Sequence, residues 1–229
     1  VDFSYEVSRS LAAVEGAVLL VDAGQGVQAQ TLANLVQAQK LGLAIIPVIN
    51  KIDLPHAQPE KVALDLVALL KISEDDIIFA SGKTGDGVED ILNTIIKKVP
   101  PPSGNPDAPL RALIFDSLYD RHRVVVTFVR IVDGSIKHKE EITLLGSAVT
   151  DCTTEVGYFT PDQYSASELT AGEIGYIVTS LRDIRLVRVG DTITLKQKSN
   201  IKNQNYGDED NHTKPLPGYK QPEPMVYAS

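Results

Sequence analysis

In "AIIPVINKIDL", residues 44–54, an apolar run ends abruptly in polar residues. The β-branched residues of "AIIPVIN" are typical of a buried strand. Asn50, Lys51 and Asp53 follow at the point where that strand ends. Since ligands of open α/β sheets bind at the carboxyl ends of the strands, we expect these three side chains to face a ligand.

The chemistry of "VINKIDL" suits a guanine base. The carboxylate of Asp53 can accept two parallel hydrogen bonds, one from the ring N–H of guanine and one from its amino group. Adenine offers no such pair of donors. We expect Asn50 to stabilise the neighbouring loops and the base edge, and the stem of Lys51 to lie over the ring. The N-K-x-D pattern alone is equally compatible with a solvated turn after a strand.

A second loop, "IIFASGKTG" at residues 77–85, strengthens the guanine interpretation. It again places small residues after a short apolar strand. We expect the backbone N–H of Gly82 to point at the guanine oxygen and Lys83 to cover the second face of the ring. A phosphate loop reads G-x-x-x-x-G-K-[ST], but Ile77 stands where its first glycine is needed. The sequence therefore holds no phosphate loop, and no D-x-x-G loop for magnesium.

The surrounding residues alternate between strand and helix patterns, which predicts a parallel α/β sheet over residues 1–99. The run "AVLLVDA" at 17–23 indicates a strand buried on both faces. The next helix should turn Leu32, Leu35 and Val36 inward, with Gly42 as its stop. Further helices are predicted in "SYEVSRSLAAVEG", in "PEKVALDLVALLK", which begins at Pro59, and in "GVEDILNTIIKKV".

The rhythm changes after "PPPSGNPDAP", residues 100–109, which we interpret as a semi-rigid linker between domains. Residues 110–198 contain short strand-like runs without a helical pattern, and Asp133-Gly134 is a hairpin signal. These features predict an all-β barrel domain. Residues 199–213 are polar, and we interpret 199–229 as a tail leading into a third domain.

Composition narrows the classes of protein. The chain has 229 residues, is 43% hydrophobic and carries a net charge of −8, which does not favour non-specific nucleic-acid binding. Three local basic clusters are present, and any of them could also be a solvated loop tip; they are 121–123, 137–139, and Arg182, Arg185 and Arg188. Cys152 is the only cysteine, so no disulfide is possible within the chain. The four histidines show no metal-ligand spacing, and no apolar run has membrane-spanning length.

The order of these features resembles the elongation factor 4 (LepA) family of translational GTPases. The resemblance covers nearly the whole chain and weakens only at 199–213. It rests on "VDFSYEVSRSLAAVEGAVLLVDAGQGVQAQTLAN", "IPVINKIDLP", "PLRALIFDS", "GYFTP", "AGEIGYIV" and "VGDTITL". The resemblance implies the C-terminal half of a GTPase domain followed by the β-barrel of translation factors.

The resemblance also implies a ligand and its site. GTP would be bound with its guanine on Asn50 and Asp53, with Lys51 packed on the nucleotide. Ser81, Gly82 and Lys83 would close the base pocket. In the family, a D-T-P-G-H motif that orders Mg²⁺ and the attacking water precedes "VDFSYEV". We therefore expect this chain to be an internal stretch of a longer protein, with no catalytic or metal-binding residue of its own and no activity alone.

As a whole, such a protein would be a ribosome-associated GTPase that back-translocates or remobilises stalled ribosomes and supports translation fidelity. Its partners would be ribosomal RNA and proteins and tRNA-bearing complexes, with Arg121 and Arg123 as RNA contacts. The family implies a monomer with peripheral membrane association, in the bacterial cytoplasm or the mitochondrial or plastid matrix. The alternative is a non-catalytic ribosome-binding module whose guanine pocket is vestigial.

The sequence departs from the family pattern in three places. Gly82 stands where alanine is usual, and either residue offers the same backbone N–H. Val124 replaces a glycine, and Lys139-Glu140 replaces a Gly-Asp turn. Because losing glycine at a positive φ costs about 1 kcal/mol, we expect these two turns to be reshaped.

Overall fold

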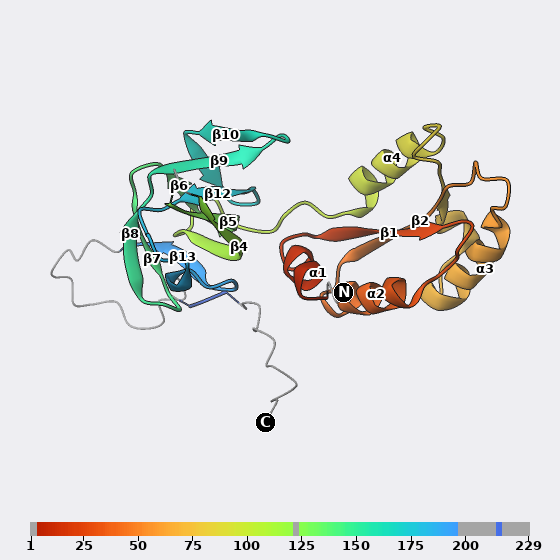
Figure 1. The fold of residues 1–229 in the computed structure, drawn as a ribbon, viewed down its shortest axis with the longest axis horizontal. Coiled ribbons are helices and arrows are strands. Elements are labelled where there is room, and N and C mark those ends of the chain that lie inside the picture. Colours follow the sequence, from red (N-terminus) through yellow and green to blue (C-terminus); the bar gives the residue numbers. More distant parts are fainter. Residues whose placement is uncertain (1–3, 121–123, 197–213, 217–229) are drawn as a thin grey trace, which may run out of the picture. The chain divides into compact units, whose positions relative to one another are not determined.

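The computed structural model describes residues 4–120, 124–196 and 214–216. The chain divides into two compact units, Val1–Pro101 and Pro102–Ser229, which we call unit 1 and unit 2 (Figure 1).

Unit 1 contains a parallel sheet in the order β1-β2-β3, as the strand–helix alternation predicts. The strands are β1 (Gly16–Asp22), β2 (Ala44–Asn50) and β3 (Ile78–Phe79). The helices are α1 (Ser4–Leu11), α2 (Ala29–Lys40), α3 (Pro59–Leu70), the short 3₁₀ turn η1 (Glu74–Asp76) and α4 (Val88–Lys98). Pro59 is the first residue of α3, where its missing N–H would have no helical partner anyway.

The helices of unit 1 cover the two faces of the sheet unequally (Figure 1). Helices α2 and α3 pack on one face, where the core contains Leu19, Val21, Leu35, Ile49, Val62, Ala63 and Leu66. On the other face, Ile91 and Ile95 of α4 pack against Ile46 and Val48 of β2. The central strand β2 is therefore covered on both sides.

Strand β1 differs from the prediction that it is buried on both faces. Val18 and Leu20 are 40% and 56% exposed, although their register partners in β2 are buried beneath α4. The apolar run therefore predicted the strand correctly, but it did not predict which of its faces is covered by helices. In α2, Leu35 is buried as expected, whereas Leu32 and Val36 are exposed. Only one row of this helix reaches the core.

Unit 2 contains an antiparallel sheet in the order β10-β9-β12-β5-β4-β13-β7-β8, and a separate pair β11-β6. Its strands are β4 (Arg111–Asp120), β5 (Val124–Asp133), β6 (Ser135–Lys137), β7 (Glu141–Leu144), β8 (Val149–Cys152), β9 (Glu155–Phe159), β10 (Gln163–Ala166), β11 (Glu168–Thr170), β12 (Ile174–Val178) and β13 (Thr192–Leu195). A 3₁₀ turn, η2 (Ile184–Leu186), lies between β12 and β13.

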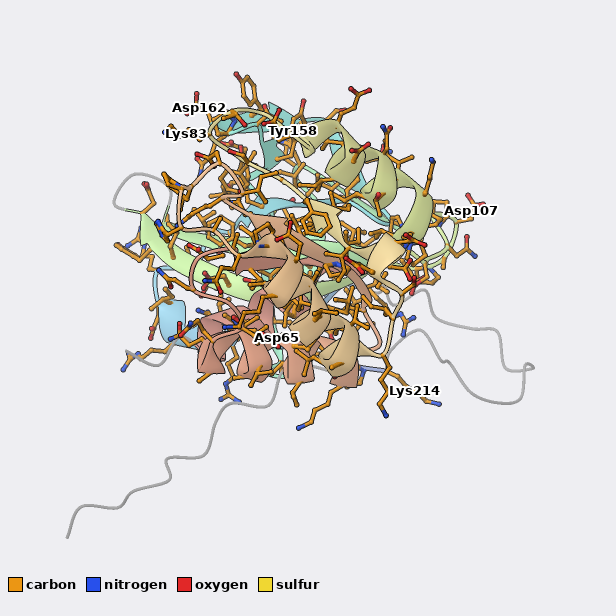
Figure 2. The ribbon with its side chains drawn as sticks, turned by 90° about the vertical axis from the view of Figure 1, so that its right-hand side faces the viewer. Asp65, Lys83, Asp107, Tyr158, Asp162 and Lys214 are labelled. Carbon is orange, nitrogen blue, oxygen red and sulfur yellow. The ribbon has the colours of Figure 1, made fainter. Side chains whose placement is uncertain are left out.

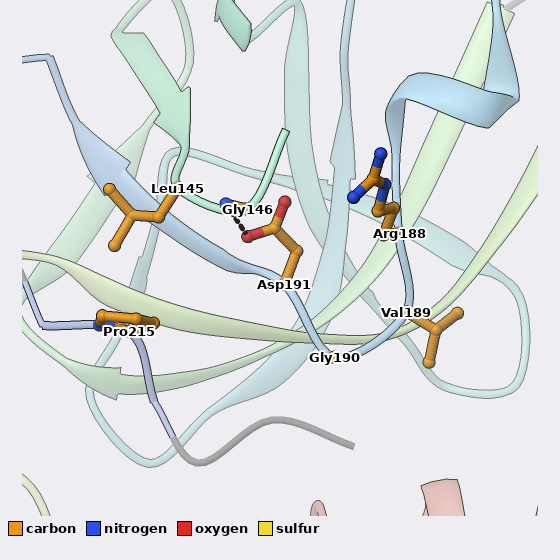
Figure 3. A pocket seen from close by; sticks show the side chains of 7 residues that line it. All are labelled: Leu145, Gly146, Arg188, Val189, Gly190, Asp191 and Pro215. Carbon is orange, nitrogen blue, oxygen red and sulfur yellow. Dashed lines mark hydrogen bonds between the residues drawn. The ribbon is translucent and has the colours of Figure 1, made fainter. Parts of the chain in front are cut away.

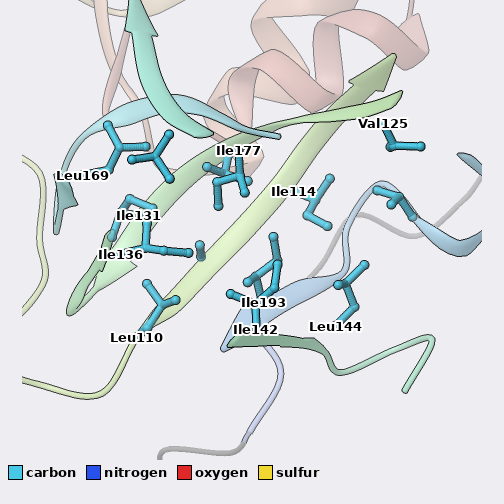
Figure 4. Packing of buried hydrophobic residues seen from close by; sticks show 14 residues of the cluster. Leu110, Ile114, Val125, Ile131, Ile136, Ile142, Leu144, Leu169, Ile177 and Ile193 are labelled. Atoms are coloured by element: carbon cyan, nitrogen blue, oxygen red, sulfur yellow. The ribbon is translucent and has the colours of Figure 1, made fainter. Parts of the chain in front are cut away.

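Both sheets of unit 2 enclose one apolar core (Figure 4). Ile136 of β6 and Leu169 of β11 belong to the same cluster as Ile114, Ile177 and Ile193 of the large sheet. The small pair therefore packs across the core from the eight-stranded sheet rather than forming a separate layer.

The hairpin expected at Asp133-Gly134 is wrong. Strand β5 pairs with β4 and β12, and β6 pairs with β11 instead of β5. Gly134 has a φ of 70°, and a side chain there would meet the Ala108 carbonyl oxygen at 2.6 Å. This glycine lets the chain leave the large sheet through a crowded bend, which sequence alone cannot distinguish from a hairpin turn.

Part of the proline-rich segment belongs to unit 2. Asn105 accepts a hydrogen bond from the Gly134 N–H at 2.9 Å, and its own N–H donates to Asp133 Oδ1 at 3.0 Å. Arg111 pairs with Oδ2 of the same aspartate. The connection between the units is therefore shorter than the predicted linker at 100–109.

Near the C-terminus, the described segment 214–216 is attached to unit 2. The Leu216 N–H donates to Thr192 Oγ1 at 2.9 Å, and Leu216 is 9% exposed. Across the described ranges, no helix combines the length and apolar character needed to cross a membrane.

Candidate nucleotide-binding site

The loops that follow β2 and β3 are tied together by the side chain of Asn50. Its Oδ1 accepts hydrogen bonds from the N–H of Lys51 at 2.8 Å and from the N–H of Gly82 at 3.0 Å. The parallel pairing of β2 with β3 brings these loops to the same edge of the sheet, because the Ala80 N–H donates to the Ile49 carbonyl at 2.8 Å. The predicted role of Asn50 in joining the loops matches this arrangement.

Asp53 and Ser81 form the second link between the loops. The Ser81 hydroxyl donates to Asp53 Oδ1 at 2.7 Å and accepts from the Thr84 N–H at 3.2 Å. Ser81 is fully buried, and the side chain of Asp53 is 17% exposed. Because each carboxylate oxygen has two lone pairs, Asp53 is oriented by Ser81 while keeping acceptor capacity for a ligand.

Lys51 and Lys83 contact carboxylates in the structure. The ammonium of Lys51 lies 2.8 Å from Asp22 Oδ2, and that of Lys83 lies 4.0 Å from Asp53 Oδ2. Lys83 is 83% exposed and lies at the outer surface (Figure 2). Because Lys83 is so exposed, the protein core does not hold its side chain in the position over the base that we expected from the sequence.

The predicted direction of the Gly82 N–H needs correction. It donates to Asn50 Oδ1 rather than being open to a base oxygen, so such an oxygen would have to share this donor. A methyl group at Gly82 would lie 3.9 Å from Asn50 Oδ1, an ordinary contact distance. Alanine at this position would therefore preserve the link.

The Gly82-Lys83-Thr84 sequence does not act as a phosphate loop here. The Thr84 hydroxyl donates to Asp86 Oδ2 at 2.7 Å, and the Ser81 N–H donates to the Asp86 carbonyl at 2.9 Å. These bonds close a compact turn before α4. In the described part of the chain, no group of three or more His, Cys, Asp or Glu residues converges to hold a metal ion.

Asp22 is a residue of this site that the sequence analysis missed. It ends β1 directly beside Asn50, its register partner in β2. Its Oδ1 accepts from the N–H of Gly24 at 2.7 Å and of Gln25 at 3.2 Å, while Oδ2 meets Lys51. Lys51, followed by these backbone donors, lowers the pKa of Asp22 below its ordinary value of 3.8. The sequence does contain a signal for Asp22: it is an acidic residue at the end of an apolar strand, and the next strand along the chain leads into N-K-x-D.

Unit 2 holds a separate cavity of about 330 Å³ (Figure 3). Its lining consists of Leu145, Gly146, Arg188, Val189, Gly190, Asp191 and Pro215. The buried Asp191 carboxylate accepts backbone hydrogen bonds from Gly146, Ser147 and Thr192. It therefore anchors the turn between β7 and β8, and none of the predicted site residues lies in this cavity.

The structure describes only some of the residues in the predicted basic clusters. Arg121 and Arg123, the predicted RNA contacts, lie outside the described residues, as does the polar stretch 199–213. Lys137 lies 3.7 Å from Glu168, and Arg185 pairs with Asp183 at 2.8 Å. These two cations therefore have local partners in unit 2.

Comparisons with known proteins identify elongation factors as relatives of this chain. Residues 1–101 match the family model described as the elongation factor Tu GTP binding domain. The whole chain is 51% identical to elongation factor 4 of Thermobifida fusca, 50% to that of Bifidobacterium longum subsp. infantis and 49% to that of Mycobacterium leprae. Each match covers 100% of this chain, but only 35%, 34% and 33% of the respective relatives. The chain thus spans about a third of their length.

A solved structure shares the fold. Translation elongation factor SelB from Methanococcus maripaludis, in complex with the GTP analogue GppNHp, superposes with a TM-score of 0.68 and 21% sequence identity. The match covers 83% of this chain and 43% of the SelB chain.

Proposed function

We propose that this chain, which belongs to the elongation factor 4 family, supplies the guanine-reading part of a GTPase that acts on the ribosome. The observation that carries this proposal is the pair of links between the two loops, Asn50 to Gly82 and Ser81 to Asp53. Both links lie at the carboxyl ends of neighbouring parallel strands, where α/β proteins bind nucleotides.

The chemistry of base selection follows from Asp53. Its carboxylate would accept hydrogen bonds from the ring N–H and amino group of guanine, each worth about 1.5–3 kcal/mol. Ser81 fixes the orientation of the acceptor before the ligand arrives, which lowers the entropy lost on binding. Adenine would leave the carboxylate desolvated without donors, and this difference gives base specificity.

Unit 2 would be the ribosome-facing part. A single core shared by the eight-stranded sheet and the β6–β11 pair supports closure into a β-barrel. In this proposal, Arg121 and Arg123 contact ribosomal RNA, and the protein works as a monomer alongside tRNA-bearing complexes. The bacterial relatives favour the bacterial cytoplasm. GTP-dependent back-translocation or remobilisation of stalled ribosomes is the activity that we assign to the whole protein.

The chain alone should bind guanine weakly and hydrolyse no GTP. Among the described residues, no glycine-rich phosphate cradle or metal-ligand cluster accompanies the base site. Base contacts without phosphate contacts should give affinity in about the millimolar range.

Asp53→Asn tests the proposed base reader. Backbone amide shifts of the ¹⁵N-labelled chain would be followed during titration with GMP, AMP and XMP. Wild type should prefer GMP, and Asp53→Asn should reverse the order of GMP and XMP, since asparagine offers a donor to the second carbonyl of xanthine. Asp65→Asn, an exposed change on α3 (Figure 2), is the matched control and should keep wild-type behaviour. A variant that still prefers GMP would exclude Asp53 as the base reader.

A further inference from the structure

We infer that Asp22 is a positioning residue for the base site, which acts by holding the ammonium of Lys51 so that the stem of Lys51 is ordered before the nucleotide arrives. This inference rests on the proposed function and adds a residue to it. Asp22 is not part of N-K-x-D or of the Ser81–Lys83 loop, and lies at the end of a different strand.

The strand register brings Asp22 to this position. Asp22 and Asn50 are paired across β1 and β2, and the Ala23 N–H donates to the Asn50 carbonyl at 2.8 Å. Lys51 follows with a left-handed φ of 65°, and its N–H is taken by Asn50 Oδ1. The strand pairing and these hydrogen bonds thus fix the backbone of both residues independently of the contact between their side chains.

The carboxylate of Asp22 is itself held in place. The Gly24 and Gln25 N–H groups donate to Oδ1, which leaves Oδ2 for Lys51 at 2.8 Å. The Asp22 side chain is 20% exposed, whereas that of Lys51 is 53% exposed. An isolated surface ion pair contributes little because two flexible side chains must be ordered. Here one partner is already ordered, so only the lysine loses freedom.

The functional consequence concerns entropy. Fixing a free lysine side chain on a ligand costs its rotamer freedom. A lysine whose ammonium is already anchored has lost part of that freedom in the unbound protein, so less is lost when the ring packs on its stem. Asp22 would therefore raise nucleotide affinity without touching the nucleotide.

Two substitutions separate the ion pair from the turn. In Asp22→Asn, the amide oxygen can still accept from Gly24 and Gln25, so the turn is kept, while the charge and the hydrogen-bond acceptor that face Lys51 are lost. In Lys51→Met, an apolar stem remains and the ammonium is lost. Each should weaken GMP binding by about three- to tenfold in the amide-shift titration of the whole chain. If the two residues act as one unit, the double variant should bind no more weakly than either single variant.

A matched control comes from a second aspartate–lysine pair of unit 1. The ammonium of Lys98 in α4 lies 2.7 Å from Oδ1 of Asp76 in η1, and Asp76→Asn should leave GMP binding unchanged. A second readout needs no ligand: the pKa of the Asp22 carboxyl, followed by ¹³C NMR, should rise in Lys51→Met. If it does not rise, the pair does not exist in solution and the inference fails.

The outcomes distinguish this inference from the function on which it rests. Wild-type chain that prefers GMP to AMP, with Asp22→Asn unchanged, overturns the role of Asp22 alone. Effects of Asp22→Asn and Lys51→Met that multiply in the double variant also overturn it. Wild-type chain that does not prefer GMP overturns the proposed function, and the role of Asp22 with it.

Discussion

At the scale of single residues, unit 2 holds left-handed backbone conformations without glycine. Val124 has a φ of 70° and Lys139 a φ of 66°. The turn at Lys139 is supported by Thr153, whose carbonyl accepts from the Lys139 N–H and whose hydroxyl accepts from the Glu140 N–H. The two turns were expected to be reshaped, but the backbone keeps positive φ at both positions. A β-branched residue such as Val124 is strained in this region.

Val124→Gly should therefore stabilise unit 2 by about 1 kcal/mol, since glycine adopts a left-handed conformation without a side-chain clash. Urea unfolding, monitored by the amide signals of unit 2, measures the change. Val149→Gly at the start of β8 is the matched control, because Val149 is not among the described residues with positive φ. It should destabilise the unit. Destabilisation by Val124→Gly would show that the valine side chain contributes more packing than its backbone strain costs.

At the scale of elements, strand β1 shows how cover, rather than composition, determines burial. Leu20 is 56% exposed, while its neighbour Val21 is 1% exposed under α2 and α3. The periodicity of an apolar run does not indicate which helices are present to cover each face. The loops after β2 and β3 could be placed from their own residues, whereas the Asp22–Lys51 pair depends on the order of the strands.

Replacing each of these two neighbours by threonine tests the assignment of the faces. Leu20→Thr should change the free energy of unfolding by less than about 0.5 kcal/mol, as expected for an exposed site. Val21→Thr should lower the free energy of unfolding by about 1–3 kcal/mol, because it buries a hydroxyl group at a site that has no hydrogen-bond partner arranged for it. Urea unfolding followed on unit 1 amides compares them. Equal losses would mean that the two faces of β1 are equally buried in solution.

The 3₁₀ turn η2 gives an element-scale prediction about pH. Asp183 caps it by accepting from the Arg185 N–H and pairs with the Arg185 guanidinium, which together lower its pKa to about 2. Because the pKa is lowered in the folded state, this stabilisation is present above the ordinary value of 3.8 and is lost as the pH falls towards 2. Arg185→Met should raise the pKa of Asp183 in a ¹³C NMR titration. An unchanged value would show that the side chain pairing is absent.

At the scale of the whole molecule, local signals were sufficient where the structure is local. The α/β character of unit 1, the helix start at Pro59 and the positions of the loops after β2 and β3 could all be predicted from neighbouring residues, and base binding at these loops stays a prediction. The role of Gly134 could not, because its crowding comes from Ala108 and Leu110, which are distant along the chain. The division at Pro101 lies inside the predicted linker, but the bond from Asn105 to Asp133, which attaches the rest of that segment to unit 2, could not be predicted because its partner is distant along the chain.

The two units should behave differently when separated. Every described strand of unit 2 pairs with another strand of the same unit and its core uses both of its sheets, so residues 102–198 alone should be soluble and unfold cooperatively. Unit 1 has β1 at the edge of its sheet, with Val18 and Leu20 exposed on the face that α4 covers over β2 but not over β1. An apolar edge strand of this kind is a template for aggregation. Residues 1–99 alone should therefore aggregate or exchange their amides quickly.

Hydrogen exchange on the two isolated units measures this difference. The matched variant is Leu20→Lys in residues 1–99, which places a charge on the exposed side of the edge strand and should reduce aggregation. Including residues 102–109 with unit 2 keeps the Asn105 bonds to Asp133 and Gly134. Strong amide protection of residues 17–23 in a monomeric, unsubstituted 1–99 would mean that β1 is stable as an edge strand. The exposed face of the sheet would then be no liability to unit 1.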